Sequence, residues 1–204
     1  MAADVVCFGE VLVRLAAPDN ELLLQSPTLK VSFGGAEANV AVSLARFGHG
    51  ARMLSVLPDN GLGHAAVDEL RRYGVDTSGV RFAAGRMGLY FMTPGAAQRS
   101  SQVLYDRADS AFSRAASGVD WDTELTGAGW LHVSGITAAI GPDTAKAAVD
   151  AVKTARRLGL TVSMDCNYRA TLWQAWNGDA PAILGEMLSQ ADLVFGDNLD
   201  IALV

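Results

Sequence analysis

The chain reads FGGAEAN at residues 33–39 and continues directly into the helix-forming run VAVSLARFG at residues 40–48. Gly34 and Gly35 let the backbone approach a ligand closely, because glycine has no Cβ. Asn39 offers hydrogen-bond donors and an acceptor, which suits a sugar hydroxyl. The N–H groups at the start of the following helix point back toward the same place. A glycine pair alone is most often a plain turn, so the prediction of a ligand-binding junction depends on what accompanies it.

The composition is that of a well-packed, acidic globular protein. Half of the 204 residues are hydrophobic, and the formal net charge is −6. No basic block is present, which argues against nucleic acid as a partner. No apolar run reaches membrane-spanning length, and residues 1–4 do not resemble a signal peptide, so we expect a cytoplasmic protein without a membrane partner. Cys7 and Cys166 lie in apolar runs and are expected to be buried, reduced thiols.

Short apolar runs alternate with helical patterns along most of the chain. Buried strands are expected at residues 5–10, 52–57, 130–134, 160–165 and 193–196. Helices are expected at residues 37–48, 64–73, 142–158 and 180–190, with a turn at 58–63 and a further helix opening at 200–204. This order predicts right-handed crossovers and a parallel sheet that binds ligands beyond the carboxyl ends of its strands.

Two segments depart from this alternation. Residues 11–17 and 28–33 are expected to be strands that leave the main body, and residues 80–105 contain short β-rich pieces broken by Gly and Pro. We expect these segments, at about 11–33 and 80–106, to form a small sheet over the main domain. The exposed edges of such a sheet favour pairing with a second copy, which predicts a homodimer.

Taken together, these residues resemble the ribokinase-like (PfkB-type) carbohydrate kinases from Val5 to the end of the chain. GGAEAN at 34–39 is similar to the sugar-binding signature of that family, and Gly61–Gly63 is similar to the turn after its second core strand. The resemblance implies an α/β fold with a ribokinase-like parallel sheet sandwiched by helices. It also implies that the small β-sheet is a lid that closes over the sugar.

Three further strings resemble the 2-keto-3-deoxygluconate kinases within this family. They are GLYF at 88–91, LYDRADSAF at 104–112 and DCNYRATLW at 165–173. Their occurrence in this order after GGAEAN is more specific than any one string. The resemblance implies that ATP, with Mg²⁺, phosphorylates the terminal hydroxyl of 2-keto-3-deoxygluconate or a close relative to give the 6-phosphate.

The side chains in these strings suit an acidic sugar. The planar guanidinium of Arg107 can bind a carboxylate, and Tyr90 and Tyr105 can each offer an apolar face and a hydroxyl. Arg169 follows a strand end, where its charge could stabilise a transferred phosphoryl group, and is the predicted catalytic residue in this chain. The predicted substrate-binding residues are Gly34, Gly35, Asn39, Tyr90, Tyr105, Arg107 and Arg169.

Several of these residues also have a plainer interpretation. Arg107 could form a weak surface ion pair with its neighbour Asp106, and the two tyrosines could be ordinary lid packing. Asp165 could simply cap the segment that follows it. His132 is flanked by apolar strand residues, so we expect a structural histidine rather than a catalytic one.

The nucleotide side of the expected site is only partly represented. The family's general base is an aspartate in a Gly-Ala-Gly-Asp loop, and this chain contains no Gly-x-Gly-Asp string. We therefore expect residues 1–204 to be the N-terminal two-thirds of a kinase domain, truncated before part of the ATP site and inactive alone. The resemblance implies that cofactor binding involves Asp165, Asn167, Asp197 and Asp200, with Asp200 near magnesium through water.

Two rival functions stay open at this point. A fructokinase or ribokinase of the same fold would bind a neutral sugar and offer Arg107 no carboxylate. A sugar-binding module without turnover is the alternative from another class. A dinucleotide-binding Rossmann protein is disfavoured, because no Gly-x-Gly-x-x-Gly string follows the first strand.

Overall fold

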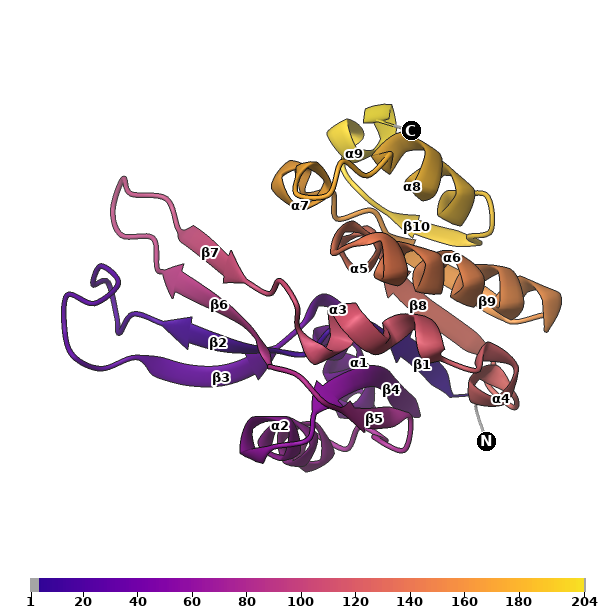
Figure 1. Cartoon of the computed structure of the whole chain (residues 1–204), viewed down its shortest axis with the longest axis horizontal. Helices are drawn as coiled ribbons and strands as arrows, with labels where there is room; N and C mark the ends of the chain where they lie inside the picture. Colours follow the sequence, from indigo (N-terminus) through magenta and orange to yellow (C-terminus); the bar gives the residue numbers. More distant parts are fainter. Residues whose placement is uncertain (1–3, 204) are drawn as a thin grey trace.

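The structure, a computed structural model, describes residues 4–203 and contains two β-sheets (Figure 1). Residues 1–3, where no signal peptide was expected, and residue 204, at the end of the last predicted helix, lie outside the described part. In the larger sheet, called the main sheet, every neighbouring pair of strands is parallel. Its order is β10 (Leu193–Phe195), β9 (Thr161–Asp165), β8 (Trp130–Ser134), β1 (Val5–Phe8), β4 (Ala51–Pro58) and β5 (Val80–Ala83).

Helices lie on both faces of the main sheet, which confirms the predicted α/β class. The helices expected from periodicity are α1 (Ala36–Arg46), α2 (Gly61–Arg72), α6 (Pro142–Arg157), α8 (Ala180–Leu188) and α9 (Asn198–Leu203). Short helices that no prediction anticipated are α3 (Ala111–Ala115), η1 (Ala116–Gly118), α4 (Trp121–Leu125), α5 (Gly135–Ala139) and α7 (Ala170–Gln174). Helix α1 packs against β1 and β4, and α6 packs against β8 and β9. Among the described residues, no helix combines the length and apolar character needed to cross a membrane.

The main sheet separates two hydrophobic cores, because side chains alternate along each strand. Val6 and Phe8 of β1 join the core beneath α6, where the Phe8 ring lies 4.7 Å from the ring of Trp121. Cys7, between them, joins the core beneath α1. Cys7 and Cys166 are both free and buried, as predicted, and burial raises the pKa of the Cys7 thiol.

The smaller sheet, called the lid sheet, extends from the end of the main sheet where β1 finishes (Figure 1). Its order is β3 (Lys30–Gly34), β2 (Leu12–Ala16), β6 (Gly88–Thr93) and β7 (Gln102–Asp106). The two predicted segments therefore do meet, through a parallel pairing of β2 with β6. The lid sheet thus adjoins the carboxyl ends of the main strands, the side on which ligands bind in parallel α/β folds.

The predicted start of the lid at residue 80 is wrong. Strand β5 pairs in parallel with residues 55–58 of β4 and forms the edge of the main sheet. Val80 packs against the core beneath α1, which keeps this strand on the main body. The lid sheet resumes only at Gly88.

The predicted turn at residues 58–63 is also partly wrong, because α2 already begins at Gly61. The side chain of Asn60 accepts hydrogen bonds from the N–H groups of Leu62 and Gly63, so it caps the helix. A Cβ at Gly63 would lie 2.0 Å from the carbonyl oxygen of Pro58. The glycine is therefore needed for close packing at a helix start rather than for a turn.

Candidate active site

A hollow of about 170 Å³, called the lid hollow, lies between the lid sheet and the main body. Its walls come from segments that are far apart in the sequence: the end of β1, the start of α1, lid strands β6 and β7, and the residues after β9. The predicted site residues that line it are Gly35, Asn39, Tyr90, Tyr105, Arg107, Asn167 and Arg169. The fold thus brings six of the seven predicted substrate-binding residues, and Asn167 of the predicted cofactor set, to a single concavity. Asp197 and Asp200 do not line it, and Asp165 lines the larger hollow described below.

Gly34 does not line the lid hollow but lies directly behind its wall. A Cβ at Gly34 would be 3.2 Å from the Tyr90 hydroxyl and 3.9 Å from Oδ1 of Asn39. The glycine therefore leaves room for the Tyr90 hydroxyl, whereas the distance to Asn39 is an ordinary van der Waals contact. Its place in the structure is that of a spacer.

The register of the lid sheet places Tyr90 and Tyr105 together on the face toward the hollow. Tyr90 of β6 pairs directly with Tyr105 of β7, and their ring centroids are 6.1 Å apart at an angle of 42°. Burial is the main reason why the pKa of Tyr90 is raised. Both rings are half-buried, so each keeps a surface available to a ligand.

Arg107 is buried rather than on the surface, and its partner is Glu10. Its Nε and Nη2 lie 2.8 and 2.6 Å from Oε2 of Glu10, and the two side chains are only 6% and 1% exposed. The alternative pairing of Arg107 with Asp106 is wrong, since Asp106 binds Arg86 at the surface. The hydrogen bond from Arg86 lowers the pKa of Asp106.

Glu10 itself was not predicted as a site residue. It stands at the end of the first apolar run, where the sequence has a single charged residue at the carboxyl end of a buried strand. That position was the available indication, because parallel sheets place functional groups there.

Glu37, inside the FGGAEAN stretch, was likewise not predicted. Its side chain is fully buried, and Oε1 accepts hydrogen bonds from the Ser134 N–H, the Ser134 hydroxyl and the Thr137 hydroxyl at 3.0, 2.5 and 2.7 Å. Burial is the largest influence and raises the pKa of Glu37. A Cβ at Gly9 would collide with this carboxylate. Glu37 therefore fixes the start of α1 to the junction between β8 and α5.

The residues after β9 and β10 form the far side of the site. Arg169 is exposed, and its Nη1 donates to the carbonyl of its neighbour Tyr168. Oδ1 of Asp197 accepts from the N–H groups of Leu199 and Asp200, which makes it the cap of α9.

The acidic residues of this side do not form a metal centre. The carboxylate of Asp200 accepts weak hydrogen bonds from the N–H groups of Tyr168 and Asp197. Burial and the charge of Asp200 raise the pKa of Asp165, which lies at the end of β9. Within residues 4–203, no group of three or more His, Cys, Asp or Glu side chains is arranged to hold a metal. These residues alone do not form a complete magnesium site, so an ion held there would also need water and nucleotide phosphates as ligands.

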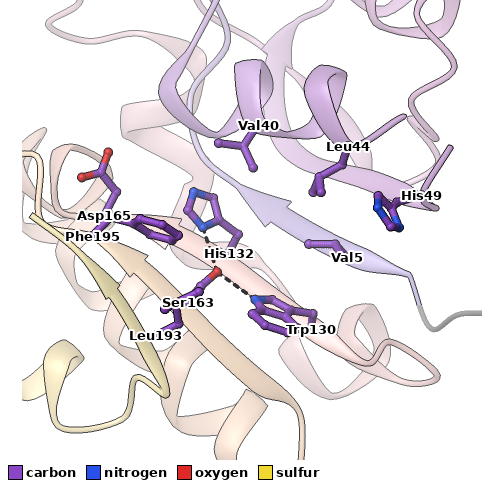
Figure 2. A pocket seen from close by; sticks show the side chains of 10 residues that line it. All are labelled: Val5, Val40, Leu44, His49, Trp130, His132, Ser163, Asp165, Leu193 and Phe195. Carbon is purple, nitrogen blue, oxygen red and sulfur yellow. Dashed lines mark hydrogen bonds between the residues drawn. The ribbon is translucent and has the colours of Figure 1, made fainter. Parts of the chain in front are cut away.

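A second, larger hollow of about 620 Å³, called the apolar groove, lies between α1 and the strands β8 to β10 (Figure 2). Trp130 Nε1 donates to the Ser163 hydroxyl at 2.8 Å, and that hydroxyl lies 2.9 Å from Nδ1 of His132. These polar side chains satisfy one another among mostly hydrocarbon walls. The structural role expected for His132 is compatible with this environment, and the lid hollow, which holds two arginines, is the better candidate for chemistry.

His132 predicts a pH dependence of stability. Burial lowers its pKa to about 4 in the folded chain, so between pH 4 and about 6.5 the unfolded chain binds more protons. The free energy of unfolding should fall as the pH is lowered through this window, by at most about 3 kcal/mol. Urea denaturation at pH 7 and 4.5 measures the effect. His132→Gln should reduce the pH dependence, whereas His49→Gln at the exposed rim should not; equal slopes for all three proteins would contradict the prediction.

The chain matches known carbohydrate kinases over its whole length. A family profile described as "pfkB family carbohydrate kinase" matches residues 2–203. The chain is 34% identical over 204 residues to 2-dehydro-3-deoxygalactonokinase from Haloferax volcanii, covering 100% of this chain and 64% of that protein. The crystal structure of 2-dehydro-3-deoxygluconokinase from Thermotoga maritima superposes with a TM-score of 0.93 at 42% identity, covering 99% of this chain and 62% of that one. Fructokinase from Xylella fastidiosa with bound ATP superposes with a TM-score of 0.81 at 25% identity, covering 95% and 57%. The chain therefore spans less than two-thirds of the length of these relatives.

Proposed function

Because this chain belongs to the pfkB family of carbohydrate kinases, we propose that it supplies the sugar-binding part of a kinase for a 2-keto-3-deoxy sugar acid. The substrate is 2-keto-3-deoxygluconate or its galactonate epimer, which correspond to the names of two relatives. The reaction transfers the terminal phosphoryl group of ATP to the terminal hydroxyl of the acid. We also propose that residues 1–204 are the N-terminal two-thirds of the kinase domain and that the protein is cytoplasmic.

The observation that carries this proposal is the pair of arginines in one small hollow. Arg107 reaches the lid hollow from the end of β7, and Arg169 reaches it from the segment after β9. The wall also carries the carboxylates of Glu10 and Glu37, but Glu10 is paired with Arg107 and Glu37 accepts hydrogen bonds from Ser134 and Thr137, so the guanidinium groups supply the charged hydrogen-bond donors of this wall. Such a wall favours an anionic sugar over a neutral one.

The other residues have roles that follow from their positions. Gly35 and Asn39 lie at the start of α1, where free N–H groups and an amide can bind sugar hydroxyls. Tyr90 and Tyr105 present ring faces to the carbon chain. Arg107 binds the carboxylate, and Arg169, which is exposed, offsets charge on the transferred phosphoryl group. Closure of the lid sheet excludes water during transfer.

The proposed nucleotide side comprises Asp165, Asn167, Asp197 and Asp200, with Asp200 contacting Mg²⁺ through water. Its support is their location at the carboxyl ends of two neighbouring main strands: Asp165 is the last residue of β9, Asn167 follows it, and Asp197 and Asp200 follow β10. Asp200→Asn should weaken the binding of ATP in the presence of Mg²⁺, measured by calorimetric titration. An unchanged affinity for ATP and Mg²⁺ would contradict this role.

The homodimer is also a proposal, and the outer face of the lid sheet supports it. Val31 and Leu104 are 64% and 62% exposed, and they stand in register with Leu15 and Phe91 on the face opposite the tyrosines. An exposed apolar row of this kind favours burial against a second copy. Sedimentation velocity should show a dimer that Leu104→Glu dissociates; a monomeric unaltered chain would contradict the proposal.

Calorimetric titration with 2-keto-3-deoxygluconate and with fructose tests the proposed substrate class. The acid should bind at least about tenfold more tightly, because its carboxylate gains a charge-assisted hydrogen bond. Tighter binding of fructose would favour a fructokinase, and binding of neither sugar would overturn the sugar-site proposal. A polypeptide extended to the length of the relatives should then convert the acid and ATP to the 6-phosphate; acid binding without turnover would favour a sugar-binding module.

A further inference from the structure

We propose that Glu10 is a positioning residue that holds Arg107 in the orientation needed to recognise the carboxylate of the sugar acid. This inference rests on the proposed function and assigns the source of its specificity to an ion pair between two residues of the wall of the lid hollow. Glu10 and Arg107 are 97 residues apart in the chain and meet in the hinge between the main sheet and the lid sheet.

The hinge brings together the strand that enters the lid sheet and the strand that leaves it. Glu10 lies between β1 and β2, and Arg107 is the first residue after β7. Ser110 follows, where it caps α3 by accepting a hydrogen bond from the Ser113 N–H. All three members of this set, Glu10, Arg107 and Ser110, are at most 6% exposed. Their contacts therefore hold the segment that leads into β2 against the segment that follows β7.

The two oxygens of the Glu10 carboxylate have different partners. Oε1 accepts a hydrogen bond from the Ser110 hydroxyl at 2.5 Å, and Oε2 accepts from Nε and Nη2 of Arg107. Within residues 4–203, no hydrogen bond engages Nη1 of Arg107. One edge of the guanidinium is thus occupied by Glu10, which leaves the Nη1 side for a carboxylate in the lid hollow.

Glycines at two positions make room for Glu10. A Cβ at Gly88, the first residue of β6, would lie 2.6 Å from Oε1 of Glu10. A Cβ at Gly35 would lie 2.3 Å from the Glu10 carbonyl oxygen. The FGGAEAN loop and the lid sheet therefore both close around Glu10, so its position is fixed by backbone as well as by hydrogen bonds.

The charges explain why a carboxylate stands behind the proposed carboxylate-binding arginine. A buried guanidinium without a counter-charge is strongly unfavourable. Glu10 compensates the Arg107 charge before a sugar binds and prevents the side chain from turning toward solvent. The hollow then keeps a preorganised donor, which lowers the entropic cost of binding the sugar acid.

Glu10→Gln tests the proposal, because glutamine keeps the shape and an acceptor for Ser110 but removes the charge that holds Arg107. The affinity for 2-keto-3-deoxygluconate, measured by calorimetry, should fall about tenfold or more, and the affinity for fructose should change much less. Asp106→Asn, which removes an equivalent charge from the exposed pair with Arg86, is the matched control and should leave both affinities nearly unchanged.

A double-mutant cycle separates positioning from a merely structural role. In an Arg107→Met background, Glu10→Gln should cause no further loss of sugar-acid binding, whereas independent structural damage would add. Glu10→Asp, which keeps the charge, should retain more acid affinity than Glu10→Gln even if both variants are less stable. Equal losses for acid and fructose, additive losses in the cycle, or an unchanged acid affinity would each overturn the role of Glu10. If the unaltered chain fails to bind the acid at all, the proposed function fails and this inference fails with it.

Discussion

Replacing Arg107 with methionine is expected to lower the free energy of unfolding by about 3–5 kcal/mol and to reduce sugar-acid affinity by at least about tenfold. Methionine preserves much of the hydrocarbon volume but leaves the Glu10 carboxylate without its cation. That carboxylate is only 1% exposed, so water cannot replace the lost partner. Denaturant unfolding measures the stability, and calorimetry with 2-keto-3-deoxygluconate measures the affinity.

Arg86→Met is the matched control for this prediction. Arg86 also lies next to the lid sheet, just before β6, and forms an ion pair with Asp106. Both side chains of that pair are substantially exposed. Its loss should cost less than about 1 kcal/mol. The double variant Glu10→Gln/Arg107→Met should recover part of the stability, because no uncompensated buried charge remains. An Arg107→Met chain as stable as the unaltered chain would show that the buried ion pair does not stabilise the hinge.

Glu37→Ala is expected to be the other severe substitution, with a loss of about 3–5 kcal/mol. It removes the shared acceptor of the Ser134 N–H, the Ser134 hydroxyl and the Thr137 hydroxyl, and it leaves a cavity beside them. The start of α1 would lose its attachment to β8, so sugar binding through Gly35 and Asn39 should weaken as well. Denaturant unfolding and calorimetry measure the two effects.

Glu37→Gln should be much milder, because an amide oxygen can replace Oε1 as the acceptor. The raised pKa of Glu37 means that the folded chain binds its proton more tightly than the unfolded chain. This group therefore makes the stability fall as the pH rises above about 4.5 toward the folded pKa, and Glu37→Gln should remove that contribution. Glu186→Ala, at a partly exposed pair with Lys153, is the control and should cost less than about 1 kcal/mol. Similar losses for Glu37→Ala and Glu186→Ala would contradict the anchoring role.

Most of the main fold could be predicted from local pattern. The apolar runs became the parallel strands of the main sheet, and helix α1 begins at Ala36, directly after the glycine pair. The failures have physical reasons. A β-rich segment such as 80–83 shows its strand character but not the sheet it will join, because pairing depends on residues elsewhere in the chain. Helices of five residues such as α5 and α7 are too short to show a helical period.

The candidate site, too, could be predicted only in part from the sequence. The sequence indicated Arg107 and the chemistry of its guanidinium, but it did not indicate that a carboxylate of the same chain already occupies one edge. The Glu10–Arg107 and Glu37–Ser134 contacts each join residues 97 positions apart. No local pattern predicts such contacts.

The amino-acid sequence by itself determined the element types, the alternation that produces a parallel sheet, and the residue types available to a sugar acid. Only the tertiary structure decided which charges face one another and which of them are shielded from water. The reason is that helical and strand propensities act over a few neighbouring residues, whereas the strength of an ion pair depends on separation and burial. For Glu10 and Arg107, the separation and the burial of the charges are both set at the hinge, where the strands entering and leaving the lid sheet come together.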